Sequence, residues 1–90
     1  MSVDLHVHKT HRQLTGGQDT IRVEGGTVGA CLQDLIGQYP GMKEKLFDGR
    51  GKLRDVIEIY VNMESAYPDE LAKPVGPGDE IHVTLLLAGG

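Results

Sequence analysis

The chain contains 90 residues, of which 39% are hydrophobic and 24% are charged, and its formal net charge is −4. This length predicts one domain over residues 1–90, and the composition is typical of a soluble globular protein. The sequence has no Lys/Arg cluster, which argues against nucleic acid as the main partner. Its longest apolar run, Leu85–Ala88, is too short to span a membrane, and no secretory signal is visible. We therefore expect a cytoplasmic protein that binds neither membranes nor nucleic acids.

The N-terminal quarter of the chain has the pattern of a β-hairpin. Residues 3–7 alternate between apolar and polar side chains, which indicates a strand with one buried face. Gly16–Gly17 supplies a turn, and residues 20–24 alternate in the same way. These two segments are therefore predicted to pair as antiparallel strands.

A helix is predicted after Thr27, which is a favourable residue for a helix N-cap. The following apolar residues recur at helical spacing and form one stripe: Val28, Leu32, Leu35, Ile36 and Tyr39. Pro40–Gly41 ends this helix. Met42 and Leu46 indicate one more helical turn before a loop at residues 48–51.

The second half of the chain carries two further strands. Residues 57–61 alternate between apolar and polar side chains and form the third predicted strand. Residues 63–75 show no clear period and are interpreted as a loop. Pro77–Gly78 fits the two central positions of a type II turn. The last strand then presents alternate residues to one face: Ile81, Val83, Leu85 and Leu87.

The order of these elements predicts an α+β protein with a mixed sheet of four to five strands. One helix with so wide an apolar stripe must cover one face of that sheet. A hairpin, a crossover helix and two later strands give the β-grasp arrangement, in which the first and last strands lie parallel at the centre. We expect Leu32, Leu35 and Ile36 of the helix to be buried against four strand residues: Leu5, Val23, Ile59 and Val83.

The sequence ends in Gly89–Gly90, directly after the last predicted strand. The chain contains 13 glycines, so chance would place two of them at its end in roughly 2% of such sequences. Two residues without a Cβ make a thin, flexible tail that can enter a narrow enzyme tunnel. We therefore predict that Gly90, through its carboxyl group, is the reactive residue and that Gly89 gives it access.

The surface next to this tail is the predicted docking surface. If Ile81, Val83 and Leu85 face inward, then Thr84 and Leu86 face outward, close to the reactive end. Tyr60, which has the outward parity of the third strand, extends the same patch. The predicted partner-binding residues are therefore Tyr60, Thr84, Leu86, Leu87 and Ala88.

The histidines are the other residues that invite a chemical interpretation. His6 and His8 share the parity of one strand face, with His11 nearby, and two such residues can bind zinc. No Asp or Glu accompanies them at a familiar spacing, so a solvated sheet face without a metal is the prediction. If the first and last strands are neighbours, His82 lies beside His6 or His8 and makes the surface sensitive to pH.

No catalytic site is evident in the sequence. Cys31 borders the apolar stripe, and without an accompanying His or Asn motif it is interpreted as a half-buried structural thiol. Residues 25–29 are rich in glycine but lack the Lys of a phosphate-binding loop. We therefore expect a protein that is not itself an enzyme and binds no cofactor or metal.

The strand order and the tail resemble the MoaD/ThiS family of ubiquitin-like sulfur carriers, over essentially the whole chain. Within that family the chain is most similar to the sulfur carrier of the thiocarboxylate-dependent cysteine pathway. The resemblance is carried by the order and spacing of these segments: Thr15–Gln18, Thr27–Ala30, Asp34–Leu35, Tyr39, Gly41, Glu44, Leu46, Gly51–Leu53, Ile59–Asn62, Gly78–Glu80 and Ala88–Gly90. The chain departs from the family at Leu85–Leu87, where Pro is common, and at Met63, where Gly or a short polar residue is common.

The resemblance implies a mechanism centred on Gly90. An E1-like enzyme would adenylate the carboxylate with ATP, and a sulfur donor would displace AMP to leave a thiocarboxylate. A sulfur-acceptor synthase would then use this sulfur on an intermediate held by pyridoxal phosphate, in the biosynthesis of cysteine or of homocysteine and methionine. A metalloprotease would release the product after Gly90. ATP and pyridoxal phosphate belong to these partners, not to this chain.

Three other functions are compatible with the same fold. The resemblance also implies a possible role as the small subunit of a molybdopterin synthase, which donates sulfur to the molybdenum or tungsten cofactor. A ubiquitin-like protein modifier would instead join Gly90 to lysines of other proteins. A plain interaction module would make no use of the tail at all.

Overall fold

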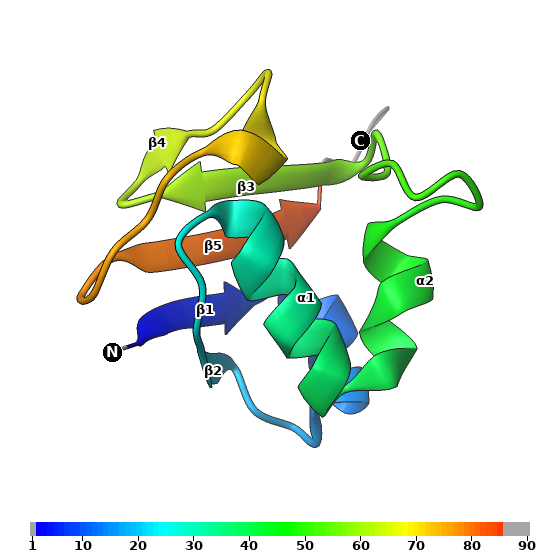
Figure 1. The fold of residues 1–90 in the computed structure, drawn as a ribbon. Coiled ribbons are helices and arrows are strands. Elements are labelled where there is room, and N and C mark those ends of the chain that lie inside the picture. The colour runs from blue at the N-terminus through cyan, green and yellow to red at the C-terminus, as the bar shows by residue number, and fades with distance from the viewer. Residues whose placement is uncertain (1, 86–90) are drawn as a thin grey trace.

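The computed structural model describes residues 2–85 and contains one five-stranded mixed sheet (Figure 1). In chain order the strands are β1 (Val3–Val7), β2 (Thr20–Val23), β3 (Ile57–Val61), β4 (Glu64–Ser65) and β5 (Glu80–Leu85). The α-helices are α1 (Val28–Gln38) and α2 (Lys43–Leu46), and three 3₁₀ helices are η1 (Lys9–Thr15), η2 (Pro40–Met42) and η3 (Glu70–Ala72). Of the helices within residues 2–85, none has the length and apolar character needed to cross a membrane.

The first and last strands lie side by side at the centre of the sheet. The strand order is β2-β1-β5-β3-β4, and β1 pairs with β5 in parallel while the other neighbouring pairs are antiparallel. Leu5 lies opposite Ile81, and Val7 lies opposite Val83. This topology confirms the predicted α+β class and the β-grasp arrangement.

Helix α1 covers one face of the sheet, as Figure 1 shows. It begins where predicted, because the Thr27 hydroxyl accepts a hydrogen bond from the Ala30 backbone N–H at 3.1 Å. Leu32 and Leu35 are completely buried, and the four strand residues expected to pack with them are buried as well. Ile36 is only partly buried, which corrects its predicted place in the core. It flanks the buried stripe instead of lying at its centre.

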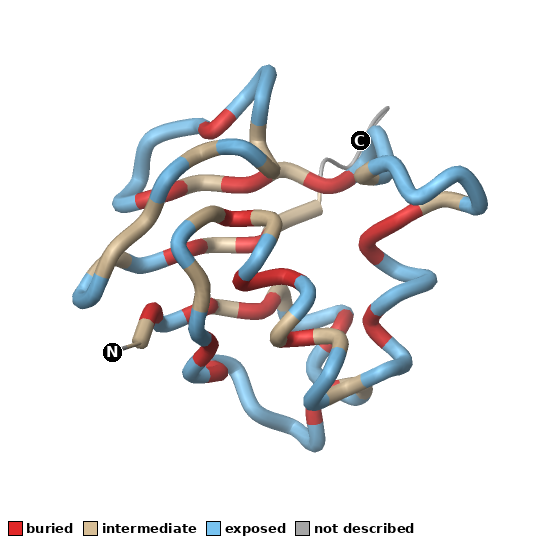
Figure 2. Tube along the Cα trace, viewed as in Figure 1, coloured by how far each residue is buried: buried red, intermediate tan, exposed pale blue. Residues whose placement is uncertain are grey.

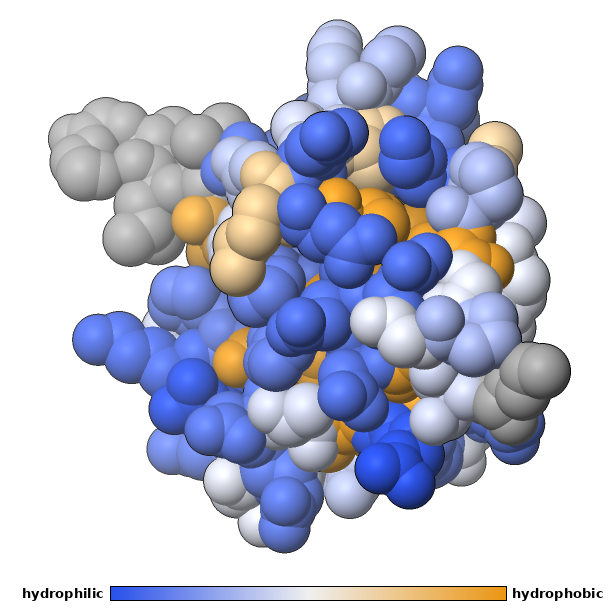
Figure 3. Space-filling view, turned by 90° about the vertical axis from the view of Figure 1, so that its left-hand side faces the viewer, coloured by the Kyte–Doolittle hydropathy of each residue, from blue (hydrophilic) through white to orange (hydrophobic). Residues whose placement is uncertain are grey.

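Residues along the strands alternate in burial, which Figure 2 shows as alternating colours along β3 and β5. Met42 and Leu46, which the sequence assigns to a further helical turn, are both fully buried and close the core beside α1. On the side seen in Figure 3, hydrophilic residues predominate and apolar residues show only in small groups between them. Most apolar side chains of residues 2–85 therefore pack into one core.

Two connections differ from the prediction. Between β1 and β2, residues 9–15, for which no element was predicted, form η1, because the His8 side chain accepts the Thr10 backbone N–H at 3.2 Å and starts the helix. Gly16, with φ +63°, ends η1. The segment 63–75 is not structureless: β4 pairs with β3, and η3 lies against α1. Elements of two or three residues are too short to produce a period in the sequence.

Two tight turns contain residues with positive φ angles: one precedes β5, and the other joins β3 to β4. Gly78 has φ +87°, and the Asp79 N–H donates to the Gly76 carbonyl at 3.0 Å, which confirms the type II turn predicted at Pro77–Gly78. Between β3 and β4, Asn62 and Met63 are the two turn residues, and their φ values are +50° and +71°. A two-residue hairpin with two positive φ angles favours Asn-Gly, so Met63 occupies a position that suits glycine.

Met63→Gly is expected to stabilise the protein by about 1 kcal/mol. A side chain with a Cβ is strained in the left-handed region, and Met63 is 74% exposed, so little packing is lost with its side chain. Urea unfolding monitored by circular dichroism measures the effect. Gly78→Ala, the reverse change at a similar φ, should destabilise by a similar amount. A neutral or destabilising Met63→Gly beside a destabilising Gly78→Ala would contradict this account of the hairpin.

Candidate functional site

The predicted reactive residues Gly89 and Gly90 lie outside the described residues, as do Leu86, Leu87 and Ala88. The described chain reaches Leu85, which ends β5 opposite Ile57 of β3. The described residues therefore end in β5, the middle strand of the sheet. The segment 86–90, which contains the predicted reactive residues, follows in the sequence.

The two described members of the predicted docking surface lie on the sheet face opposite α1. Thr84 is opposite Glu58 and Tyr60 is opposite His82, and all four are partly buried, whereas Ile81 and Val83 are buried. The Thr84 hydroxyl donates to the Glu58 carbonyl at 3.4 Å. The predicted outward parity of Thr84 and Tyr60 therefore agrees with the structure, and the parity of Leu86 stays a prediction.

The three histidines of the N-terminal run do not form one surface. His6 lies on the open sheet face, His8 lies at the start of η1, and His11 lies within η1 with only 6% of its surface exposed. The solvated face predicted for His6 and His8 therefore does not extend to His11, which is buried. The reason is that the strand ends at Val7, so the alternation that relates His6 to His8 does not continue.

The register of the central strands places His82 opposite His6, as the sequence suggested for neighbouring first and last strands. The two imidazole rings stack, with centroids 4.3 Å apart and planes inclined by 10°. Burial, and then the nearby His6, lower the pKa of His82, while Glu80 acts in the opposite direction. Nδ1 of His82 has no hydrogen-bond partner within residues 2–85.

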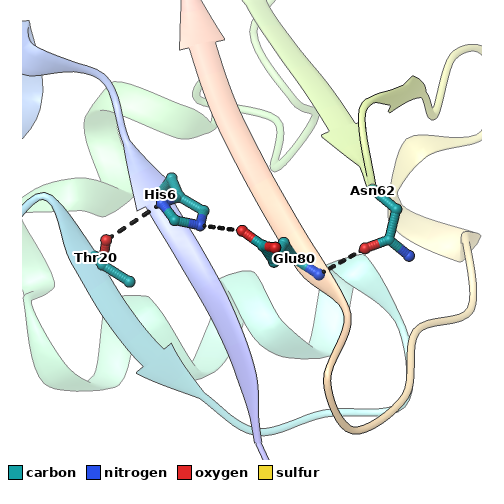
Figure 4. A network of polar contacts seen from close by, with 4 residues as sticks. All are labelled: His6, Thr20, Asn62 and Glu80. Carbon is teal, nitrogen blue, oxygen red and sulfur yellow. Dashed lines mark hydrogen bonds and ion pairs between the residues drawn. The ribbon is translucent and has the colours of Figure 1, made fainter.

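A polar network that sequence reasoning missed surrounds this pair (Figure 4). Nε2 of His6 lies 2.8 Å from Oε1 of Glu80, and Nδ1 of His6 lies 3.2 Å from the Thr20 hydroxyl. The Glu80 backbone N–H donates to the side-chain carbonyl of Asn62 at 3.0 Å, and the Asn62 amide donates to Asp79 at 3.1 Å. The network thus joins β2, β1, β5 and the hairpin after β3. The contact between Glu80 and His6 could have been predicted if the register of β1 against β5 had been known, because Glu80 precedes by two residues the partner of His6, His82.

Cys31 is completely buried in α1, more than the half-buried position that the sequence suggested. Its thiol is oriented toward the Gly25 carbonyl, with Sγ 3.7 Å from the oxygen. Burial, and then the nearby Asp34, raise the pKa of Cys31, so its reactive thiolate form is disfavoured. The structural interpretation of this thiol is therefore supported.

No family model matches the chain, but comparison with known proteins finds related sequences and structures. "Sulfur carrier protein CysO" of Mycobacterium tuberculosis H37Rv is 36% identical over 93 aligned positions that cover both chains completely. "Small archaeal modifier protein 1" of Haloferax volcanii is 32% identical over 77 positions, covering 82% of this chain and 85% of the relative. The solved structure of an Amycolatopsis orientalis BexX/CysO complex matches with a TM-score of 0.88 and 29% identity, over 98% of this chain and 99% of the other.

The fold and the sequence similarity define a ubiquitin-like carrier protein with a β-grasp core. More particularly, the chain belongs to the MoaD/ThiS-type sulfur carriers and is similar to CysO over its whole length.

Protonation of His11 is expected to destabilise the fold below about pH 6.5. Burial lowers the pKa of His11 from the ordinary value of 6.5, and His8 and then Lys45 add to this effect. The unfolded chain therefore binds the proton more readily than the native protein does. The contribution to stability is fully present above pH 6.5 and is lost as the pH falls.

Melting temperatures measured from about pH 7.5 to 5, in EDTA, test this expectation. The melting temperature of the wild type should fall over the lower part of this range, and His11→Gln should reduce the slope to the part contributed by other groups, among them His82, whose pKa is lowered as well. A profile that keeps the wild-type slope in His11→Gln would show that other groups cause the change.

Proposed function

We propose that this protein carries sulfur as a thiocarboxylate on Gly90. The observation that carries the proposal is the burial of Cys31, the single cysteine of the chain. A sulfur carrier needs an accessible atom to which sulfur can be attached, and a thiol that is completely buried and has a raised pKa is a poor nucleophile. The terminal carboxyl group of a Gly-Gly tail is the alternative that the sequence offers.

The proposed chemistry takes place on partner enzymes. An E1-like enzyme uses ATP to convert the Gly90 carboxylate into an acyl-adenylate and releases pyrophosphate. A sulfur donor then attacks the acyl carbon, and AMP leaves with the bonding electrons. The β-grasp domain contributes docking and a positioned nucleophile, and the partners contribute catalysis. The solved complex of CysO with BexX, which matches this chain over nearly its whole length, supports a partner protein.

We propose that the sulfur is used for cysteine, or for homocysteine and methionine. A pyridoxal-phosphate synthase would accept it, and a metalloprotease would then cleave after Gly90, all in the cytoplasm. Similarity to CysO over the whole chain supports this pathway ahead of a molybdopterin synthase subunit. Conjugation to proteins is a second candidate, because a relative with 32% identity is named a modifier protein.

Removal of Gly90 is expected to abolish sulfur loading. Incubation of the full chain with its activating enzyme, ATP and sulfide should increase the intact mass by the difference between one sulfur and one oxygen atom. The chain without Gly90 should show no such increase while keeping its circular dichroism spectrum. Gly49→Ala, which alters an exposed loop with open space around it, should load normally. Loading of the shortened chain would overturn the proposal.

The docking surface is proposed to comprise Tyr60, Thr84 and the segment Leu86–Ala88. Leu86→Asp should weaken binding to the activating enzyme at least about tenfold, because one apolar anchor near an interface centre can dominate affinity. Calorimetric titration with the partner and a melting curve measure the two effects separately. Met63→Asp, in the exposed turn between β3 and β4 and at the opposite end of β3 from Leu85, serves as the control and should bind normally. Loss of stability with unchanged affinity would assign Leu86 to the core instead.

A further inference from the structure

The central strands bring three potential metal ligands together on the open face of the sheet. His6 comes from β1, and Glu80 and His82 come from β5. One ligand atom from each of the three lies within 4.8 Å of the others. The prediction that the histidines hold no metal depended on the lack of a carboxylate at a familiar spacing. The parallel register supplies that carboxylate from the other end of the chain, so the reason for the prediction no longer applies.

The distances are close to those of a bound ion. In a tetrahedral zinc site with bonds of 2.0–2.2 Å, neighbouring ligand atoms are about 3.3 Å apart. Nε2 of His6 and Oε1 of Glu80 are now 2.8 Å apart, which is a hydrogen-bond distance. A small rotation of the Glu80 side chain, which is 52% exposed, provides the difference. The His82 ring must turn out of its stack with His6, and it is only partly buried.

The Thr20 hydroxyl group allows His6 to change from a hydrogen-bond donor to a metal ligand. With its proton on Nε2, His6 donates to Glu80, and the Thr20 hydroxyl donates to Nδ1. A metal at Nε2 requires the other tautomer, with the proton on Nδ1. The same hydroxyl then accepts from Nδ1–H, since a hydroxyl can act in both roles. A hydrogen bond of this kind orients the imidazole of many metal sites.

Glu80 is also held from outside the cluster. Its backbone N–H donates to the Asn62 side chain, which is itself held by Asp79 (Figure 4 shows the first of these contacts). This arrangement fixes the start of β5 relative to the hairpin after β3. The carboxylate is therefore presented by a backbone that does not need to move when an ion binds.

We propose that His6, Glu80 and His82 bind one divalent transition-metal ion, for which zinc is the best match. Two imidazoles and a carboxylate are a ligand set that zinc accepts, with a fourth position left to water or to a ligand from another molecule. An ion bound here links β1 to β5 and stabilises the centre of the sheet. This site lies within residues 2–85 and is independent of the chemistry at Gly90.

Zinc titration of the untagged full chain, after dialysis against EDTA, tests the site. Calorimetry should show saturable binding of one Zn²⁺ per chain, and replacement by Co²⁺ should give the visible absorption of a four-coordinate ion. Saturating zinc should raise the melting temperature by several degrees or more, as expected for a ligand that binds only the native state.

Three ligand variants and one control make the test specific. His6→Gln, His82→Gln and Glu80→Gln should each weaken zinc binding by at least about tenfold and remove the zinc-dependent rise in melting temperature. His8→Gln alters a histidine at the start of η1, outside the cluster, and should leave both unchanged. Circular dichroism in EDTA establishes that each variant is folded. The proposal is overturned if the wild type binds no zinc stoichiometrically, or if folded ligand variants bind it as well as His8→Gln does.

Discussion

The parallel pairing of β1 with β5 is the constraint on which the rest of this structure depends. It joins residues from the two ends of the chain, so a large loop must close before its hydrogen bonds form. Parallel neighbours also need a crossover, and α1 supplies it while covering the apolar face of the sheet. The buried residues of the two strands, which include Leu5 and Ile81, lie under this helix and offset the entropy of closure.

The same pairing determines which polar residues meet on the opposite face. His6 and Glu80 are 74 positions apart in the sequence, yet they form a contact of 2.8 Å. No local pattern in either segment indicates this contact, because each strand shows only its own alternation. It becomes predictable only when the topology and the register are both specified. A search for ligand motifs along the sequence therefore misses the cluster of His6, Glu80 and His82, because the parallel register of β1 and β5 brings these residues together.

The elements that sequence reasoning located correctly are those whose period spans several residues. Helix α1 repeats its apolar stripe over three turns and has a recognisable N-cap at Thr27, and β3 and β5 alternate over five or six residues. The elements that it missed depend on single contacts. The 3₁₀ helix η1 starts from a hydrogen bond to His8, and β4 is a two-residue strand defined by pairing alone. The outward parity of the proposed docking residues Tyr60 and Thr84 was predicted from alternation and agrees with the structure, whereas the proposed roles of Gly89 and Gly90 rest on sequence and family resemblance.

The position of Cys31 shows how this fold keeps its own thiol away from the surface. Cys31 lies in the first half of α1, and the backbone before the helix approaches it closely: a Cβ added at Gly25 would lie 2.8 Å from the Cys31 nitrogen. Glycine at position 25 is therefore needed for the chain to pack against the helix. This packing keeps the thiol out of contact with reagents. In the proposed function, Cys31 would therefore not compete for the activated acyl group of Gly90, and the partner enzymes would meet no second nucleophile of this chain.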